Sequence, residues 1–330
     1  MHLRPVSRTL LLSLLAVLVL AAAGCGREAE GSSDENIANA ANNSEEELSG
    51  RVQADGSSTV GPLTSAAAEL YREVQPGVNV TVGISGTGGG FERFCRGETD
   101  ISNASRAIDE EEAALCEEAG IEFTELQVAI DALTVVVNQE NDWADCLTVE
   151  QLNAIWEPGS TISNWSDVPG GDYPDVALPL AGPGTDSGTF DYFTDEVNGE
   201  EGASRTDYTP SEDDNVIVQA VSGDSGGLGY FGFTYYEENE DTLKAVEIDG
   251  GNGCVAPSAE AARSGDYSPL ARPLFIYVKN ESLARPEIES FVGYFLENIE
   301  EIAGAALFIP PSDEQKAEAI ATFEAAAEAT

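Results

Sequence analysis

The chain has 330 residues, with 60 Asp and Glu against 15 Lys and Arg, so its formal net charge at pH 7 is −45. This charge excludes nucleic acid as a partner, because such binding needs Lys and Arg against the phosphates. The only histidine is His2, so Ser-His-Asp catalysis, Cys-His catalysis and imidazole metal ligation are excluded for the rest of the chain. The composition therefore favours a binding protein over an enzyme, with no metal ion and no cofactor.

The first segment has the features of an export signal. Arg4 and Arg8 precede an apolar run over residues 10–23, which is too short by itself for a membrane-spanning helix of about 20 residues. The run leads into Ala-Ala-Gly-Cys25, which resembles a bacterial lipobox, where the Cys becomes the lipidated first residue of the mature protein. We expect a signal peptide over residues 1–24 and a lipid anchor on Cys25 at the outer face of the cell membrane. A plain secretory signal with an incidental Cys is the alternative.

A polar segment separates this anchor from the folded part of the chain. Residues 26–50 are mainly Ser, Asn, Glu and Ala, with almost no large apolar side chain, so they cannot bury enough surface to fold. We therefore assign residues 25–49 to a lipidated tether that behaves as a random coil.

Strand and helix patterns alternate after the tether. Strands are predicted from period-two alternation or β-branched runs, and helices from apolar residues at helical spacing. The predicted strands are 51–54, 78–84 and 132–137, and the predicted helices are 63–74, 91–95 and 109–119. Gly120 is expected to end the last of these helices.

The pattern restarts near residue 148, where Thr148 and Gln151 have the spacing of a capping box. Further helices are predicted at 149–156, 190–193, 215–221, 286–302 and 312–328, and a second buried strand at 274–278. Strands that alternate with helices predict an α/β fold with mainly parallel sheets. We place domain one at residues 50–136 and 272–330 and domain two at residues 137–271, with the two buried strands as the crossings.

Four cysteines remain in the mature chain, and they are Cys95, Cys116, Cys146 and Cys254. An even number outside the cytosol predicts two disulfide bonds, with three alternative pairings. Metal binding is the rival role, but the chain has no Cys-x-x-Cys pair and no histidine to complete a site.

Three loops rich in glycine and hydroxyl side chains stand before helices, at residues 56–59, 85–90 and 186–189. Exposed N–H groups at a helix start bind anions, and the helix dipole favours negative charge there. Glycine allows close approach of the backbone, and Ser and Thr add donors. A tetrahedral oxyanion needs donors from several directions, and three such loops could surround it. Each loop alone is a weak signal, because Ser and Thr before helices are usually simple N-caps.

Taken together, these segments resemble the PstS family, the phosphate-binding proteins of ABC importers. The resemblance runs from about residue 52 to 325. The matching stretches are DGSSTV at 55–60, GISGTGG at 83–89, DISNASR at 100–106, DSGTF at 186–190, GYFG at 229–232 and RPLF at 272–275. The resemblance implies a type II periplasmic-binding-protein fold, a two-domain clamshell that binds phosphate in its interdomain cleft. It also implies delivery to the permease and ATPase of an importer.

The resemblance implies phosphate ligands in all three loops. Carried over by position, they are Ser58, Thr59, Thr87, Ser187, Gly188 and Thr189. One departure is that family members carry a proton-accepting Asp where this chain has Arg106, and an Arg where it has Pro183. We therefore expect Arg106 to supply the positive charge and Asp186 to accept the phosphate proton. Arg205 and Arg272 are the next candidates for the cation, and a surface pair with Glu110 is the alternative role of Arg106.

The hinged clamshell also bears on the disulfides. A bridge between the two domains would restrain the hinge motion that capture needs. We therefore pair Cys95 with Cys116 and Cys146 with Cys254, because each pair then falls within one proposed domain.

Three rival functions remain from the sequence. The protein could bind another tetrahedral oxyanion, such as sulfate or molybdate. It could be a phosphatase-class enzyme that uses carboxylates alone. It could also be a surface sensor or adhesion protein on the same fold. The acidity itself is typical of salty surroundings, where screening hides self-repulsion, and also of ordinary secreted proteins.

Overall fold

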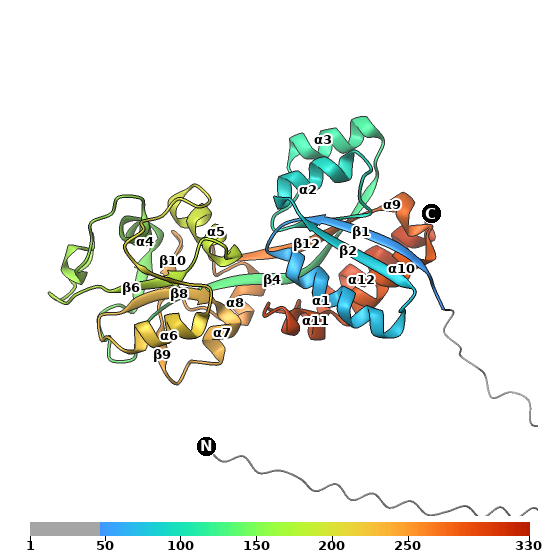
Figure 1. The fold of residues 1–330 in the computed structure, drawn as a ribbon. Helices are drawn as coiled ribbons and strands as arrows, with labels where there is room; N and C mark the ends of the chain where they lie inside the picture. The colour runs from blue at the N-terminus through green and yellow to red at the C-terminus, as the bar shows by residue number, and fades with distance from the viewer. Residues whose placement is uncertain (1–46) are drawn as a thin grey trace, which may run out of the picture. The chain divides into compact units, whose positions relative to one another are not determined.

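The computed structural model of the chain describes residues 47–330 (Figure 1). The predicted signal peptide, Cys25 and the predicted tether up to residue 46 lie outside these residues. Within residues 47–330 there is no helix both long enough and apolar enough to cross a membrane.

A mixed sheet of nine strands runs through the described residues, in the order β2-β1-β3-β12-β4-β8-β6-β7, with β9 beside β4. Its strands are β1 (Gly50–Gly56), β2 (Val78–Ile84), β3 (Ile101–Ala104), β4 (Phe123–Asn138), β6 (Leu180–Pro183), β7 (Thr209–Ser211), β8 (Leu228–Gly232), β9 (Leu243–Ala245) and β12 (Ala271–Lys279). A second, small sheet contains β5 (Cys146–Thr148), β10 (Glu247–Asp249) and β11 (Cys254–Val255).

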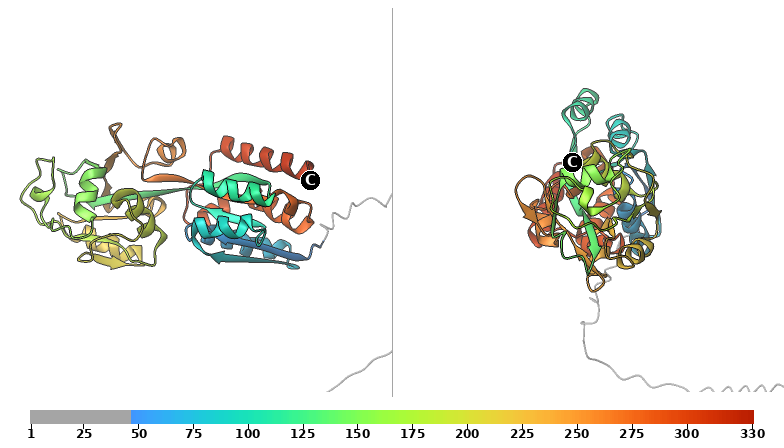
Figure 2. Two further views of the ribbon diagram at one scale, coloured as in Figure 1. Left: turned by 90° about the horizontal axis from the view of Figure 1, so that it is seen from above. Right: turned by 90° about the vertical axis from the view of Figure 1, so that its left-hand side faces the viewer.

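The centre of the large sheet is antiparallel. The strands β1, β2 and β3 pair in parallel, as do β6, β7 and β8, but every pair that includes β4 or β12 is antiparallel. The prediction of mainly parallel sheets is therefore wrong here. The chain leaves the first half of the sheet along β4 and returns along β12, so these neighbours must run in opposite directions; Figure 2 shows them side by side.

Helices cover the sheet. They are α1 (Val60–Val74), α2 (Gly86–Cys95), α3 (Glu110–Ala119), α4 (Val149–Trp156), α5 (Gly188–Phe193), α6 (Asp214–Ser222), α7 (Phe233–Glu237), α8 (Ala259–Ser264), α9 (Asn280–Leu283), α10 (Pro286–Glu297), α11 (Ile299–Ala305) and α12 (Asp313–Glu328). The predicted capping box is present, since the Thr148 side chain accepts from the Gln151 N–H. Gly120 ends α3 with a φ of 69°, a left-handed conformation that suits glycine.

Two predicted boundaries are wrong. The predicted 85–90 loop is helical from Gly86, and within it Gly90 packs against β1, where a Cβ would lie 2.5 Å from the Gly56 Cα. The predicted helix over 286–302 is broken at Asn298, whose side-chain amide donates to the Tyr294 carbonyl, 2.8 Å away, and so ends α10.

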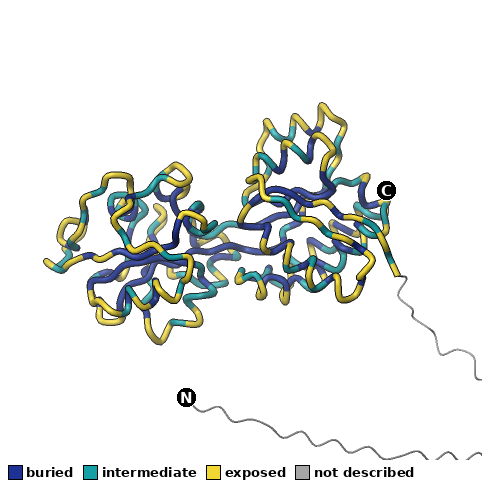
Figure 3. Tube along the Cα trace, viewed as in Figure 1, coloured by how far each residue is buried: buried dark blue, intermediate teal, exposed yellow. Residues whose placement is uncertain are grey.

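Two large hydrophobic cores lie on the two halves of the sheet. Leu126 and Val128 of β4 pack into the first core with α1, α10 and α12, whereas Leu133 and Val135 pack into the second with α4 and α5. Figure 3 shows how much of the central strands is buried. The predicted domain boundaries stay a prediction. The division between the two cores on β4 falls between Ala129 and Leu133, a few residues before the predicted boundary at 136.

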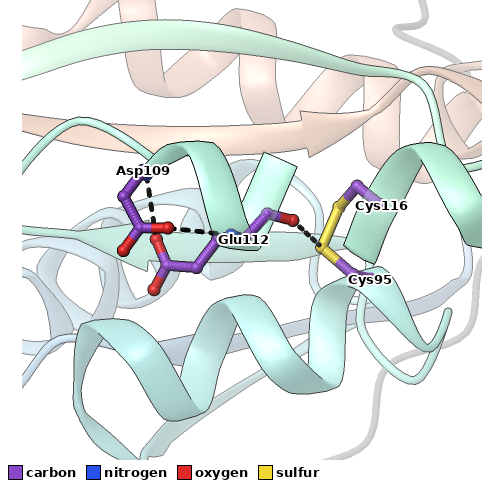
Figure 4. The surroundings of a disulfide bond; sticks show 4 residues. All are labelled: Cys95, Asp109, Glu112 and Cys116. Carbon is purple, nitrogen blue, oxygen red and sulfur yellow. Dashed lines mark hydrogen bonds between the residues drawn. A yellow bond between two sulfur atoms is a disulfide. The ribbon is translucent and has the colours of Figure 1, made fainter. Parts of the chain in front are cut away.

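Both predicted disulfide pairings are present. Cys95 at the end of α2 is bonded to Cys116 in α3, and Cys146 of β5 is bonded to Cys254 of β11. The first bond holds α2 against α3, where Glu112 completes a capping box with Asp109 (Figure 4). The disulfide therefore fixes the end of α2 to α3, while the capping box fixes the start of α3 itself.

Candidate ligand-binding site

The first predicted loop connects β1 to α1. The Ser57 hydroxyl accepts hydrogen bonds from the Thr59 N–H (3.2 Å) and the Val60 N–H (3.4 Å), so Ser57 holds the turn that leads into α1. Ser58 is left exposed, and the side chain of Thr59 is buried beneath it. Ser58 and Thr59 are therefore available for a ligand, while Ser57 has a structural task.

The second predicted segment begins α2. Thr87 and Ser105 have their hydroxyl oxygens 3.0 Å apart, and the Ser105 N–H donates to Thr87 at 3.3 Å. Ser85 donates to Asp55, 2.6 Å away, and Asp55 is also paired with Arg93. Ser105 lies inside a stretch that carries the family resemblance. Its contact with Thr87 forms only because the β3–α3 connection lies beside α2, and no local sequence pattern predicts that arrangement.

The third predicted loop precedes α5. Ser187 caps α5 by accepting from the Thr189 N–H at 3.2 Å, and the Asp186 N–H donates to Glu212 at 3.3 Å. A Cβ on Gly188 would lie only 3.2 Å from the Thr59 hydroxyl, so this loop lies against the first loop.

A cavity of about 560 Å³ opens between these segments. It is lined by Ser57, Ser58, Thr59, Ser85, Gly86, Thr87, Gly88, Gly89, Ser105, Arg106, Ala107, Asp191, Tyr192, Asp195, Glu196, Glu201, Arg272, Pro273 and Phe275. Of the predicted ligands, Ser58, Thr59, Thr87 and Arg106 are in this lining. Asp186, Ser187, Gly188 and Thr189 are not, although Gly188 lies against Thr59. The lining beyond the first two loops is supplied by the β3–α3 connection, by α5, by the π-helix Thr194–Asn198 and the turn that follow α5, and by β12.

Arg106 is held by an acidic neighbour. Its guanidinium donates to both carboxylate oxygens of Glu112, at 2.7 and 2.8 Å, and to the Ala107 carbonyl at 3.1 Å. These hydrogen bonds raise the pKa of the Arg106 guanidinium above its ordinary value. The partner is Glu112 rather than the predicted Glu110, because the capping box of α3 turns Glu112 back toward the start of the helix.

Arg272 occupies the opposite side of the first loop. It donates to the Thr59 hydroxyl at 3.1 Å and to one oxygen of Asp131 at 3.3 Å, and it lies 3.6 Å above the Tyr192 ring. Burial raises the pKa of the Asp131 carboxyl, and Arg272 opposes this shift. Arg205, the other runner-up for the cation, lies outside the cavity lining and donates to the carbonyls of Ile155 and Ile162.

Carboxyl groups line the far wall of the cavity. Burial is the main cause that raises the pKa of Asp191 and of Glu196. Glu201 raises the pKa of Asp191 further, and Asp195 that of Glu196. Arg272 opposes both shifts. The site therefore combines hydroxyl and guanidinium donors with proton-accepting carboxyls. Sequence reasoning missed this wall, because nothing local distinguishes these carboxylates among 60 acidic residues.

The fold and its polar cavity are those of a ligand-binding protein, and the family model described as the PBP superfamily domain matches residues 41–298. Protein SphX of Synechococcus elongatus is 47% identical over 262 residues, which cover 78% of this chain and 77% of that protein. The phosphate-binding protein PstS of Staphylococcus saprophyticus is 38% identical, covering 79% of this chain and 80% of that protein.

Among solved structures, a possible phosphate binding protein from Planctomyces limnophilus aligns with a TM-score of 0.81 and 44% identity. The alignment covers 84% of this chain and 99% of the chain from Planctomyces limnophilus. The chain therefore belongs to the PstS family of the PBP superfamily, a family of substrate-binding proteins, as its motifs predict.

Proposed function

We propose that this protein captures inorganic phosphate in the cavity beside the β1–α1 loop and the start of α2, without catalysing a reaction. The observation that carries the proposal is the convergence of hydroxyls from Ser58, Thr59, Thr87 and Ser105 on one cavity that two arginines also line. The relatives named for phosphate support the same ligand. The amino-terminal ends of α1 and α2 reach this cavity, so their dipoles add favourable potential for an anion.

The carboxyl wall bears on selectivity. Near neutral pH phosphate keeps at least one proton, which it can donate to a carboxylate, whereas sulfate has none. Asp191 and Glu196 line the cavity, and Asp186 is the candidate from the third loop if that loop approaches on ligand binding. A carboxylate accepts but cannot donate while ionised, so it would repel sulfate and bind protonated phosphate.

Delivery to an ABC-type importer belongs to the same proposal. Family membership supports transfer of phosphate from this protein to a permease and ATPase complex. The proposed lipid on Cys25 would hold the protein at the outer face of the cell membrane, where a second acyl chain makes anchoring stable. A Cys25→Ser variant should leave the membrane fraction for the soluble one. A variant that still pellets wholly with membranes would contradict the anchor and leave phosphate capture untouched.

The cavity is tested with a hydroxyl deletion. Thr87→Val keeps the shape of the side chain and removes its hydroxyl. We expect it to weaken phosphate binding about 10- to 100-fold, the usual worth of a hydrogen bond to a charged group. Titration calorimetry on exhaustively dialysed protein measures the affinity, with Thr161→Val at an exposed position outside the cavity lining as the matched control. Equal affinities for the two variants would count against this cavity.

A further inference from the structure

Arg272 is the point where segments from both halves of the sheet meet. It lies in β12, pairs with Asp131 of β4, donates to Thr59 after β1, and stacks on Tyr192 of α5. Its side chain is 18% exposed, and it lines the cavity. The stacked ring and the two hydrogen-bonded partners hold the guanidinium plane from three sides.

Part of this guanidinium is unused. An arginine has five N–H donors. The Nε–H of Arg272 donates to Asp131, and Nη2 donates to Asp131 and Thr59. No residue in the described part of the chain accepts a hydrogen bond from Nη1. The bonds to Asp131 are 3.3 Å long, just beyond the usual range for N–H···O bonds, so this ion pair is loose; Asp191 and Glu196 act on Arg272 only through space.

Arg106 offers a ligand less. Both of its terminal nitrogens already bind Glu112 with bonds of 2.7 and 2.8 Å, in the two-pronged geometry that is the strongest for a guanidinium. Its side chain is 46% exposed, so water weakens any further pairing. An incoming anion would have to displace Glu112 to bind Arg106 in the same way.

The contact with Thr59 has a second consequence. A hydroxyl that accepts from Arg272 through a lone pair keeps its own proton for another partner. Gly188 lies against this hydroxyl, where a Cβ would approach it to 3.2 Å. Arg272 therefore fixes Thr59 as a donor at the point where the first and third loops touch.

We propose that Arg272, rather than Arg106, is the guanidinium that binds the phosphate, through its Nη1 donors, while it also orients Thr59. This assignment rests on the proposed function. Because Arg272 contacts residues of both halves of the sheet, it couples the anion directly to the strands β4 and β12 that join them. Arg106 then remains with Glu112 as a structural link between the β3–α3 connection and α3.

The test compares three variants by phosphate calorimetry, with thermal unfolding as the check on folding. Asp131→Asn removes the carboxylate that competes for Arg272, so phosphate should bind as tightly as to the parent, or more tightly. Asp131→Asn with Arg272→Gln removes the guanidinium from the same background without leaving a buried lone carboxylate. We expect it to bind phosphate at least about 100-fold more weakly, the scale for loss of one partner of a buried charge pair. Arg106→Gln should stay within about threefold.

The outcomes separate the assignment from the proposed function. A parent that does not bind phosphate overturns both. If the parent binds phosphate and the affinity of the double variant is within threefold of that of Asp131→Asn, the assignment alone is overturned. If Asp131→Asn binds phosphate as weakly as the double variant, the Arg272–Asp131 pair is only structural, and the assignment is overturned too. If only Arg106→Gln loses phosphate affinity, Arg106 is the guanidinium that binds the anion, and the assignment to Arg272 is overturned.

Discussion

Gly90 and Gly88 provide a matched test of how α2 is held against β1. A Cβ on Gly90 would lie 2.5 Å from the Gly56 Cα and 3.1 Å from the Asp55 carbonyl oxygen, and both are backbone atoms that cannot rotate away. A Cβ on Gly88 would meet only the ends of Glu112 and Arg106, at 3.6 and 3.9 Å. The two positions lie two residues apart in the same helix, so they share the gain in helix propensity and differ in the space available.

The size of the difference follows from these distances. Gly→Ala inside a helix stabilises by about 0.5–1 kcal/mol when the new methyl fits, which is the expectation for Gly88→Ala. Overpacking costs about 1–3 kcal/mol, and contact with backbone places Gly90→Ala at the upper end of that range. We therefore expect the free energy of unfolding of Gly90→Ala to be roughly 2 kcal/mol below that of the parent, and about 3 kcal/mol below that of Gly88→Ala.

Urea unfolding in phosphate-free buffer measures this difference, because bound ligand would itself add stability. Thermal midpoints should differ by roughly 6–12 °C, given about 2–4 °C per kcal/mol for a chain of this size. Gly90→Ala should also weaken phosphate binding, since α2 carries Thr87 into the cavity. Equal midpoints for the two variants would refute the close approach of α2 to β1.

Three further predictions concern stability. Replacing both Cys95 and Cys116 by Ala should cost about 2–4 kcal/mol in urea unfolding, and an unchanged midpoint would mean that the bond does not form. Burial, with neighbouring acids, raises the pKa of Asp214 to about 6, so the folded state binds a proton that the unfolded chain releases above pH 3.8. The protein therefore loses stability as pH rises from about 4 to about 6. Asp214→Asn should raise the thermal midpoint at pH 7.5 but not at pH 4. The same gain at both pH values would contradict the raised pKa. Arg205→Met should cost about 2–4 kcal/mol, because buried carbonyls lose their donors, yet leave phosphate affinity unchanged; a selective loss of affinity would return Arg205 to the site.

Local patterns predicted much of the fold. Period-two alternation located β1 and β2, and the Thr148 and Gly120 signals located helix ends, because caps depend on a few neighbouring residues. The antiparallel centre of the sheet was missed, since strand direction depends on how the chain returns through β12 and not on any strand's own sequence.

The site was predicted in part for the same reason. The segments before the helix starts are visible in the sequence, and the family resemblance implied Ser58 and Thr87 as ligands within them; both line the cavity. The partners of Arg106 and Arg272 are not visible in the sequence, because Glu112 and Asp131 approach them only through the packing of α3 and β4. The acidic wall on and after α5 was also beyond sequence reasoning, since charge count alone says nothing about which carboxylates share a cavity.

The central claim is that this cavity binds phosphate and rejects sulfate. The most direct measurement is calorimetric titration of the dialysed parent protein at neutral pH with each anion in turn. Phosphate should saturate a single site, and sulfate should bind at least about 100-fold more weakly, because it has no proton to donate to the cavity carboxylates. Equal affinity for the two anions, or no saturable heat with phosphate, would contradict the account.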